Sequence, residues 1–454
     1  MLLVGVAAST GSPGAGTARA AARRPNILII VTDDQTTGTV LPAVMPNTVR
    51  EFVRRGRRYP NFFVTDPLCC PSRASIMTGR FDHNNGVTDN SAAGFHLDMS
   101  TTLQHYLHEA GYRTWISGKF LNGWPVRPGS PNPPDWDRFL ITQGGRHLDL
   151  PFNQDGRFFR YAPYAEPLIE RQASRYLAGT ERHDAQPWFG YLSFTVPHGP
   201  YTPMRGYRRL PFHVRAPSPA EQERNISDKW PGYAAHAQYG FDSADWLEQL
   251  RMLHQADDII GDIFSQLRSQ RELRNTIVVF LSDNGFLFRS HQLLGKRLPY
   301  TEAVRVPAMI RWPGHIRAGS VDRRFSTNVD LAPTLLKAAG VTPDPLVAPF
   351  DGRNLLGRRW TRRYVLLEHW ASPPPHKPQA WAPTWGSLRS ARWQYIEYDD
   401  AAGNVTFREY YDLVHDRWML RNRLAGRSPP SATRLARLHA LLAAARSCAG
   451  PTCP

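Results

Sequence analysis

One short run of this chain combines a thiol, a helix start and a guanidinium. The run is Cys69-Cys70-Pro71-Ser72-Arg73, and it follows the turn Asp66-Pro67. It leads into a predicted short helix that ends at Gly79. Proline suits a first helical turn, so Cys69 is expected at a helix N-terminus, where free N–H groups and the helix dipole favour an anion. The run predicts a nucleophile for an oxyanion ester. Two simpler interpretations are a buried, inert cysteine and a bond between the two neighbours.

Side chains with carboxylate, amide, ammonium or imidazole groups also follow four apolar runs that are typical of buried parallel strands. They are Asp33-Asp34 after the run 26–32, Lys119 after 112–117, His198 after 188–194, and Asp283-Asn284 after 276–281. In an open α/β sheet, ligands bind at the carboxyl ends of the strands. The sequence therefore predicts that these side chains meet at one sheet edge, whereas any one of them alone is explained by an ordinary polar turn.

The residue types define the chemistry of this edge. Asp33, Asp34, Asp283 and Asn284 offer oxygen ligands, which suit Ca²⁺ or Mg²⁺ rather than zinc or copper. Three clustered carboxylates without a cation would repel one another and raise their pKa values. A divalent cation there would polarise an ester oxygen. The simpler interpretation is a helix cap at the first pair and a turn at the second.

Lysine is rare here, because 5 of the 55 basic residues are lysine and the others are arginine. Two of the five, Lys119 and Lys296, fall in candidate site positions, where a compact ammonium reaches into a tight pocket. His198 is expected to donate a proton to a leaving alkoxide or to hold an ester oxygen. The alternatives are solvated surface lysines and a structural histidine in a proline-rich loop.

The elements that position these groups indicate an α/β fold. Strand-like runs alternate from Asn26 onward with helical patterns at 103–110 and 246–268, which favours an open, mainly parallel sheet. Residues 124–240 are rich in Pro, Gly and aromatic residues and are expected to form long loops around the site. From about residue 360 the chain is expected to form a smaller α+β unit that ends in a helix over 432–446.

The composition narrows the class of partner. The formal net charge is +16, which implies an anionic substrate or partner, although dispersed arginine is also typical of GC-rich coding. Nucleic acid is not expected, because no basic helix, zinc-finger spacing or RNA-binding motif is present. No apolar run approaches the roughly 20 residues that a membrane span needs.

Both ends of the chain carry signals of an oxidising compartment. Residues 1–24 are expected to be a signal-like or disordered leader, with an apolar start and a small-residue Ala18-Arg19-Ala20 site but no positive n-region. Cys448 and Cys453 enclose a short Gly/Pro loop that can close as a local disulfide. We therefore expect export to the periplasm or the extracellular space.

These motifs resemble the sulfatase family. Cys69-Cys70-Pro71-Ser72-Arg73 with Thr78-Gly79-Arg80 is similar to the family's Cys-x-Pro-Ser-Arg signature, in which the first cysteine becomes formylglycine. The opening strand with Asp33-Asp34 resembles the first metal pair, and Ser282-Asp283-Asn284-Gly285 resembles the second. Lys296 matches the sulfate-binding lysine, and His291 lies where many members have a histidine.

Within the family, the chain is most similar to the N-acetylglucosamine-6-sulfatases. The doubled cysteine, Gly118-Lys119-Phe120-Leu121-Asn122 and the ending 447–453 carry this similarity. Leu121 departs from the histidine of most sulfatases, so we expect Asn122 or water to fill part of that role. Phe286-Leu287-Phe288-Arg289 departs from the histidine and small residues of the glucosamine-6-sulfatases.

The resemblance implies an alkaline-phosphatase-like sandwich with a large mixed, mainly parallel sheet. A catalytic domain over 25–358 and a smaller α+β domain over 359–454 are expected. The implied cofactors are Ca²⁺, with Mg²⁺ as the alternative, and formylglycine derived from Cys69 by a formylglycine-generating enzyme. The formylglycine hydrate would attack sulfur while Arg73 holds the hydrate, and Lys119, His198 and Lys296 hold the sulfate.

The implied substrate is a sulfated sugar, including the 6-O-sulfate of N-acetylglucosamine in glycosaminoglycans, with Asn122 and His291 among the substrate-binding residues. Two other functions stay open from the sequence. One is a phosphonate or phosphate ester hydrolase on the same scaffold. The other is a non-catalytic protein that binds sulfated polysaccharide through its positive charge, with salt-sensitive affinity.

Overall fold

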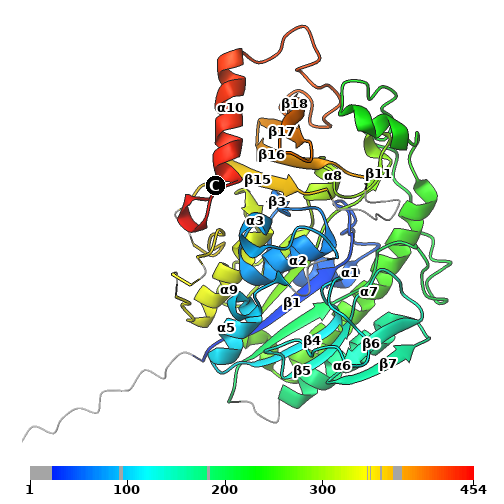
Figure 1. Cartoon of the computed structure of the whole chain (residues 1–454). Helices are drawn as coiled ribbons and strands as arrows, with labels where there is room; N and C mark the ends of the chain where they lie inside the picture. The colour runs from blue at the N-terminus through cyan, green and yellow to red at the C-terminus, as the bar shows by residue number, and fades with distance from the viewer. Residues whose placement is uncertain are drawn as a thin grey trace, which may run out of the picture.

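The computed structural model describes residues 23–91, 96–180, 185–344, 346–347, 349–357, 360–371 and 381–454. A large sheet crosses the molecule, and a smaller sheet lies beside it next to the C-terminal helix (Figure 1). In order across the large sheet, the strands are β13 (Ser320–Val321), β2 (Arg57–Arg58), β12 (Ala308–Arg311), β9 (Thr276–Ser282), β1 (Asn26–Thr32), β8 (Trp188–Ser193), β4 (Arg113–Lys119), β5 (Arg138–Thr142), β6 (Leu150–Gln154) and β7 (Arg157–Tyr161).

The five central strands, β9, β1, β8, β4 and β5, run parallel to one another. Strand β12 pairs antiparallel with β9 on one side, and β6 and β7 add antiparallel strands on the other. Strands β1 and β9 are buried along their whole length, as their unbroken apolar sequences predict for strands covered on both faces. The predicted α/β fold, with a mixed and mainly parallel sheet, is confirmed.

Two layers of helices cover the sheet. Ile27, Ile29 and Val31 face a core shared with α2 (Cys69–Thr78), α5 (Leu103–Glu109) and α9 (Leu331–Ala339). Leu28 and Ile30 face the opposite core, shared with α6 (Ala165–Thr180) and α7 (Ser243–Ser269). Because successive side chains of a strand point to opposite faces, one apolar run fills both cores.

The region 124–240 is more ordered than its composition predicts. It contains β5, β6 and β7 and the 16-residue helix α6 besides the expected strand β8. In α6, buried residues recur at helical spacing, including Leu168, Ile169, Ala173, Tyr176 and Leu177. This amphipathic pattern outweighs the loop-like composition around it, so the prediction of long loops is wrong over α6, whereas residues 194–230 contain neither helix nor strand.

The smaller sheet is antiparallel and consists of β15 (Tyr364–His369), β16 (Thr384–Ser390), β17 (Trp393–Asp399) and β18 (Val405–Asp412). Helix α10 (Ala432–Ala445) packs on it through Leu438 and Leu442, beside Leu366, Leu388 and Tyr395. The predicted C-terminal α+β unit is thus present, while its boundary at 358/359 stays a prediction.

Short elements complete the chain. The helical ones are α1 (Pro46–Thr48), η1 (Val49–Val53), α3 (Asp82–Asn85), η2 (Met99–Thr101), η4 (Pro231–His236), η5 (Glu272–Asn275), η6 (Ser290–Gln292), α8 (Thr301–Val304), η7 (Asn328–Asp330) and η8 (Gly450–Thr452). The strand pairs are β3 (Phe62–Phe63) with β14 (Ser326–Thr327) and β10 (Leu287–Phe288) with β11 (Leu294–Gly295). In the part of the chain that the structure covers, no helix combines the length and apolar character needed to cross a bilayer.

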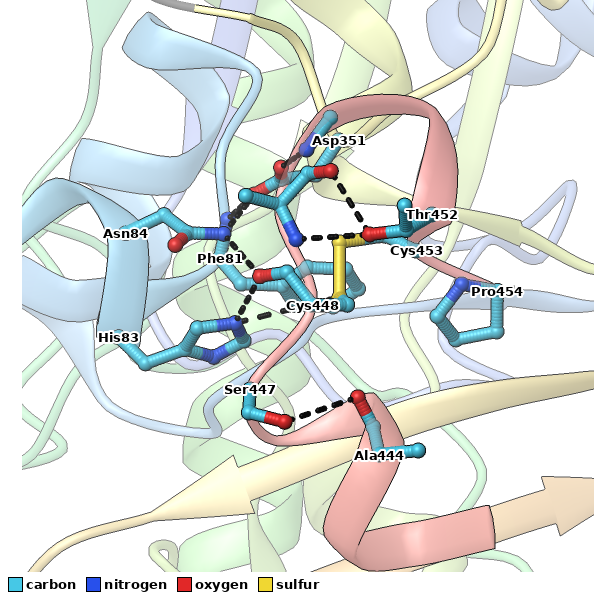
Figure 2. Close-up of a disulfide and its surroundings, with 12 residues drawn as sticks. Phe81, His83, Asn84, Asp351, Ala444, Ser447, Cys448, Thr452, Cys453 and Pro454 are labelled. Carbon is cyan, nitrogen blue, oxygen red and sulfur yellow. Dashed lines mark hydrogen bonds between the residues drawn. A yellow bond between two sulfur atoms is a disulfide. The ribbon is translucent and has the colours of Figure 1, made fainter.

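A disulfide joins Cys448 and Cys453, as their spacing allows. Figure 2 shows how this loop is held against α3 and Asp351. The Cys448 carbonyl oxygen is 3.0 Å from His83 Nε2 and accepts a 2.9 Å hydrogen bond from Asn84 Nδ2, while Gly450 N donates to Asp351 Oδ1 at 2.7 Å. The disulfide thereby fixes the chain end beside α3, which directly follows α2 and Gly79.

Candidate active site

The strand ends deliver their polar groups to one pocket. Ligand atoms of Asp33, Asp34, Cys69 and His198 all lie within 4.8 Å of one another. Asp33 N donates to Val196 O at 3.0 Å, which ties the end of β1 to the segment after β8. The pocket therefore lies at the carboxyl edge of the parallel strands, where the sequence predicts it.

Cys69 begins α2, and its thiol lies inside this pocket. The Lys296 ammonium is 2.8 Å from Cys69 Sγ, and Asp33 Oδ1 is 3.8 Å away. Cys69 and Cys70 are both buried and free, so the two neighbours are not bonded to each other. Burial raises the pKa of the Cys69 thiol in spite of Lys119 and Lys296, which lower it. An unmodified Cys69 is therefore held as a neutral thiol, a weak nucleophile.

Two lysines offset the carboxylates, and of these Lys119 is buried and Lys296 is half-buried. Lys119 Nζ donates to both oxygens of Asp33, at 2.8 and 2.7 Å, and Lys296 pairs with Asp34. Burial by itself would raise the pKa of Asp33, but Lys119 and His198 lower it to about 2. Asp34 follows the same pattern, with Lys296 and His198 lowering its pKa. Both carboxylates are therefore ionised at neutral pH.

The position of Lys119 depends on its neighbour Gly118. Gly118 has φ +116°, and a Cβ atom there would lie 1.7 Å from the Ser193 carbonyl oxygen. Only glycine permits this close approach of β4 to β8. Lys119 is the next residue and ends β4, and its side chain is fully buried.

Arg73 links three parts of the pocket. Its Nε donates to Asp283 Oδ2 at 2.9 Å, and its Nη1 donates to Lys119 O at 3.1 Å and to Ser193 Oγ at 2.6 Å. Arg73 thus holds Asp283, the end of β4 and the end of β8 together. A direct contact with the nucleophile, as the resemblance implies, stays a prediction.

The oxygen donors fit a hard cation. Asn284 Nδ2 donates to Asp34 Oδ1 at 2.7 Å, while Asn284 Oδ1 is buried and has no hydrogen-bond partner among the described residues. A buried amide oxygen without a donor is costly unless a cation binds it. Asp283 is held more tightly, because its Oδ1 accepts from Asp34 N at 3.1 Å and from Asn284 N at 2.8 Å.

His198 stands at the open side of the pocket. Its side chain is 24% exposed, and Nε2 lies 3.5 Å from Asp34 Oδ2. The other ring nitrogen, Nδ1, contacts the Gly199 carbonyl oxygen. Because a carbonyl oxygen only accepts hydrogen bonds, Nδ1 carries a hydrogen and Nε2 is the atom left for proton transfer.

The structure gives the contacts of the two other predicted substrate-binding residues, Asn122 and His291. Asn122 contacts Cys70, with its backbone N–H donating to Cys70 Sγ at 2.8 Å, so its contact is with the second cysteine rather than the first. His291 is buried with Nδ1 2.6 Å from Glu223 Oε2 and its ring centroid 4.3 Å from Tyr300. Burial and Lys229 lower the pKa of His291 to about 3.

His291 is not among the residues whose ligand atoms cluster at Cys69. It contacts Glu223, and its role in substrate binding stays a prediction.

Sequence reasoning also missed several residues in or behind the pocket. Asn90 Oδ1 accepts from Cys70 N at 3.0 Å and satisfies the first turn of α2. Ser193 ends β8 and binds Arg73, so the strand-end rule could have found it. His147 lies behind His198, with Nε2 2.6 Å from the His198 carbonyl oxygen, and no motif marks it.

Comparisons with known proteins agree with this geometry. The sulfatase family model matches residues 25–341, and a model described as N-sulphoglucosamine sulphohydrolase, C-terminal, matches residues 289–442. An extracellular sulfatase SULF-1 homolog of Drosophila melanogaster is 32% identical over 77% of this chain and 32% of its own length. The N-acetylglucosamine-6-sulfatase of Homo sapiens is 27% identical over 96% of this chain and 86% of its own.

A solved structure, described as a complex with its substrate D-glucosamine-2-N,6-O-disulfate, aligns with a TM-score of 0.73 at 24% identity. The alignment covers 92% of this chain and 97% of that one, and it shows the shared fold. The chain spans about a third of the Drosophila relative's length and about half of a Caenorhabditis elegans relative's.

Proposed function

Because this chain belongs to the sulfatase family, we propose that it hydrolyses sulfate esters of sulfated sugars, including the 6-O-sulfate of N-acetylglucosamine in glycosaminoglycans. One observation carries the proposal: Cys69 begins a helix inside a pocket in which two carboxylates, two lysines and a histidine converge. The human relative's name and the glucosamine disulfate of the aligned structure support the sugar.

Asp33, Asp34, Asp283 and Asn284 would hold the cation, with Ca²⁺ favoured and Mg²⁺ as the alternative. When bound, the cation would polarise a sulfate oxygen and neutralise charge that develops on it. The unpartnered Asn284 Oδ1 supports this donor set. Until a cation binds, Lys119 and Lys296 offset the two carboxylates of the first pair.

Cys69 is the residue that a formylglycine-generating enzyme would modify. The formylglycine hydrate would supply the oxygen nucleophile that the neutral Cys69 thiol does not provide. The helix N-terminus of α2 favours the negative charge that develops beside it.

The other side chains bind and orient the ester. Lys119 and Lys296 present fully charged ammonium groups to the sulfate oxygens, since the neighbouring carboxylates raise the pKa of both lysines although burial alone would lower it. His198, when it carries a hydrogen on both ring nitrogens, gives the Nε2 proton to the departing sugar oxygen, which leaves as a hydroxyl. Arg73 keeps Asp283 and β4 in register with this set.

We also propose export to the periplasm or the extracellular space. The extracellular sulfatase relatives and the Cys448–Cys453 disulfide support it. The leader expected at 1–24 lies almost wholly outside the described residues.

Mass spectrometry of the tryptic peptide that ends at Arg73, from protein made in its native host, tests the nucleophile. We expect formylglycine at Cys69 and an unmodified Cys70. Cys69→Ala should lower sulfate release by at least about 1,000-fold, whereas Cys70→Ala, the matched control, should keep most of the activity. Full release of sulfate by Cys69→Ala would refute covalent catalysis at this residue.

Paired sulfate and phosphate esters of one sugar test the reaction class. We expect faster release of sulfate than of phosphate. Faster release of phosphate would favour the ester hydrolase alternative. Salt-sensitive binding of heparin without any release would favour the non-catalytic binding protein.

A further inference from the structure

The loop over 195–202, which carries His198, is fixed at three points by residues from outside the pocket. Thr195 Oγ1 lies 2.6 Å from Glu166 Oε1, and Thr195 N donates to the same oxygen at 3.1 Å. The His198 carbonyl oxygen lies 2.6 Å from His147 Nε2. Tyr164 Oη donates to Thr202 O at 2.9 Å. Segment 147–166 therefore holds both the start and the end of the loop.

His147 lies in the middle of a hydrogen-bonded chain. Its Nδ1 is 2.9 Å from Thr195 Oγ1, so the order of contacts is Glu166, Thr195, His147 and the His198 carbonyl oxygen. His147, Thr195 and Glu166 are all buried, and the His147 ring stacks on Tyr164 with centroids 5.6 Å apart. Because these side chains are buried, the loss of any one hydrogen-bond partner costs free energy, and this favours a single arrangement of the side chains.

The chemistry of the chain fixes one hydrogen. A carbonyl oxygen only accepts, so His147 Nε2 must carry a hydrogen to bind His198 O. A neutral His147 then accepts at Nδ1 from the Thr195 hydroxyl, which accepts in turn from a protonated Glu166. An imidazolium with an ionised Glu166 contains the same number of protons. The bond to His198 O is present in both arrangements.

We propose that His147 is a positioning residue for proton transfer by His198. The bond from His147 Nε2 fixes the backbone of His198, and with it the reach of the imidazole toward the leaving oxygen. This inference rests on the proposed function, in which His198 protonates the departing sugar oxygen. His147 itself contacts neither the nucleophile nor the carboxylates in the described contacts.

Two isosteric substitutions separate the two bonds of His147. Glutamine places its amide nitrogen near the position of Nε2 and keeps a donor for His198 O. Asparagine places its amide near Nδ1, keeps the contact with Thr195 and loses the donor. Both variants remove the ring from Tyr164, so a loss of packing affects them alike.

The leaving group supplies the readout. A nitrophenolate leaves without a proton, whereas a sugar alkoxide needs one. We expect His147→Asn to lower kcat on a sugar sulfate by about 10-fold to 100-fold with little change in KM, and to leave turnover of nitrophenyl sulfate nearly unchanged. His147→Gln should retain both activities. Equal losses on the two substrates, or equal losses in the two variants, would overturn the proposal.

A double-mutant cycle tests whether His147 acts through His198. In a His198→Ala background, His147→Asn should have no further effect on the sugar sulfate. Additive losses would show that His147 acts by another route.

Hydrogen exchange provides a readout that needs no turnover. Peptides over 195–202 should exchange faster in His147→Asn than in His147→Gln, while peptides of β1 and β9 stay the same. Unchanged exchange over 195–202 would overturn the proposal even if the enzyme were inactive. A wild-type protein without sulfate release would instead refute the proposed function, which keeps the two failures distinct.

Discussion

Two buried carboxylate pockets in this molecule have opposite electrostatics. In the active-site pocket, lysines contact Asp33 and Asp34, and the pKa values of these two carboxyl groups are lowered. In the second pocket, Glu409 on β18 is fully buried and accepts hydrogen bonds from Trp230 N at 3.0 Å and from the hydroxyls of Tyr300 and Tyr411 at 3.2 and 2.9 Å. Burial nevertheless raises the pKa of Glu409 to about 7.

The difference shows which partners can offset desolvation. Neutral donors satisfy the oxygens of Glu409 geometrically but supply no net charge, and the nearby Lys229 bonds to Glu223 at 2.8 Å. The Lys119 ammonium group, 2.8 and 2.7 Å from the two Asp33 oxygens, keeps Asp33 ionised at the same depth of burial. A pocket that must hold a cation or an oxyanion therefore needs full charges inside it.

Removal of one active-site lysine should have the largest effect. Lys119→Met leaves Asp33 buried without its cation, so we expect a loss of about 3 to 5 kcal/mol in the free energy of unfolding of the metal-free protein and near-complete loss of sulfate release. Urea unfolding and sulfate assays measure the two effects. The control is Lys337→Met, at an exposed lysine of α9. A loss below about 1 kcal/mol would contradict the pairing described here.

The Glu409 pocket should respond to pH. The folded pKa of about 7 lies above the ordinary value of 4.5, so its contribution to stability is present below pH 4.5 and is lost as the pH rises through 7. Glu409→Gln should remove this fall in the free energy of unfolding, which is about 3 kcal/mol at 1.36 kcal/mol per pKa unit.

Urea unfolding at pH 5 and pH 8 compares Glu409→Gln with the wild type, and the exposed Glu109→Gln is the control. An identical pH dependence in wild type and Glu409→Gln would show that Glu409 is ionised in the folded protein at neutral pH.

Chelation should affect the active-site pocket and leave the Glu409 pocket unchanged. With Ca²⁺ or Mg²⁺ at 100 times its Kd, binding adds about 2.7 kcal/mol to stability, so EDTA should lower the Tm and the rate of sulfate release. Thermal unfolding with each cation added back identifies the preferred one. Asp33→Asn should lose the response and Glu409→Gln should keep it. An unchanged Tm in EDTA would refute the proposed cation site.

The smallest effect is expected beside Cys70. If Asn122 fills part of the role of the histidine that Leu121 replaces, Asn122→Ala should lower sulfate release by about threefold, because the Asn122 side chain contacts the second cysteine, with Oδ1 3.7 Å from Cys70 Sγ, and not the first. Steady-state kinetics measures the change. Unchanged turnover in this variant would remove Asn122 from the site.

Much of the pocket could be predicted from the sequence, since parallel strands deliver their carboxyl ends to one edge. Asp33 and Asp283 follow unbroken apolar runs, Lys119 and His198 follow weaker strand patterns, and Cys69 follows a turn into a helix. The contact of His291 with Glu223 could not be predicted, because spacing along the chain does not encode the direction of the segment after β10. The loops predicted over 124–240 were wrong where the amphipathic period of α6 outweighed composition.

The sequence by itself determined the α/β fold, the helix start at Cys69 and the residues that end each strand, because local periodicity and turn chemistry act over a few neighbours. Only the tertiary structure decided which lysine offsets which aspartate, that Arg73 binds Asp283, and that His147 lies behind His198. Those contacts join residues from 51 to 262 positions apart, and burial sets their strength.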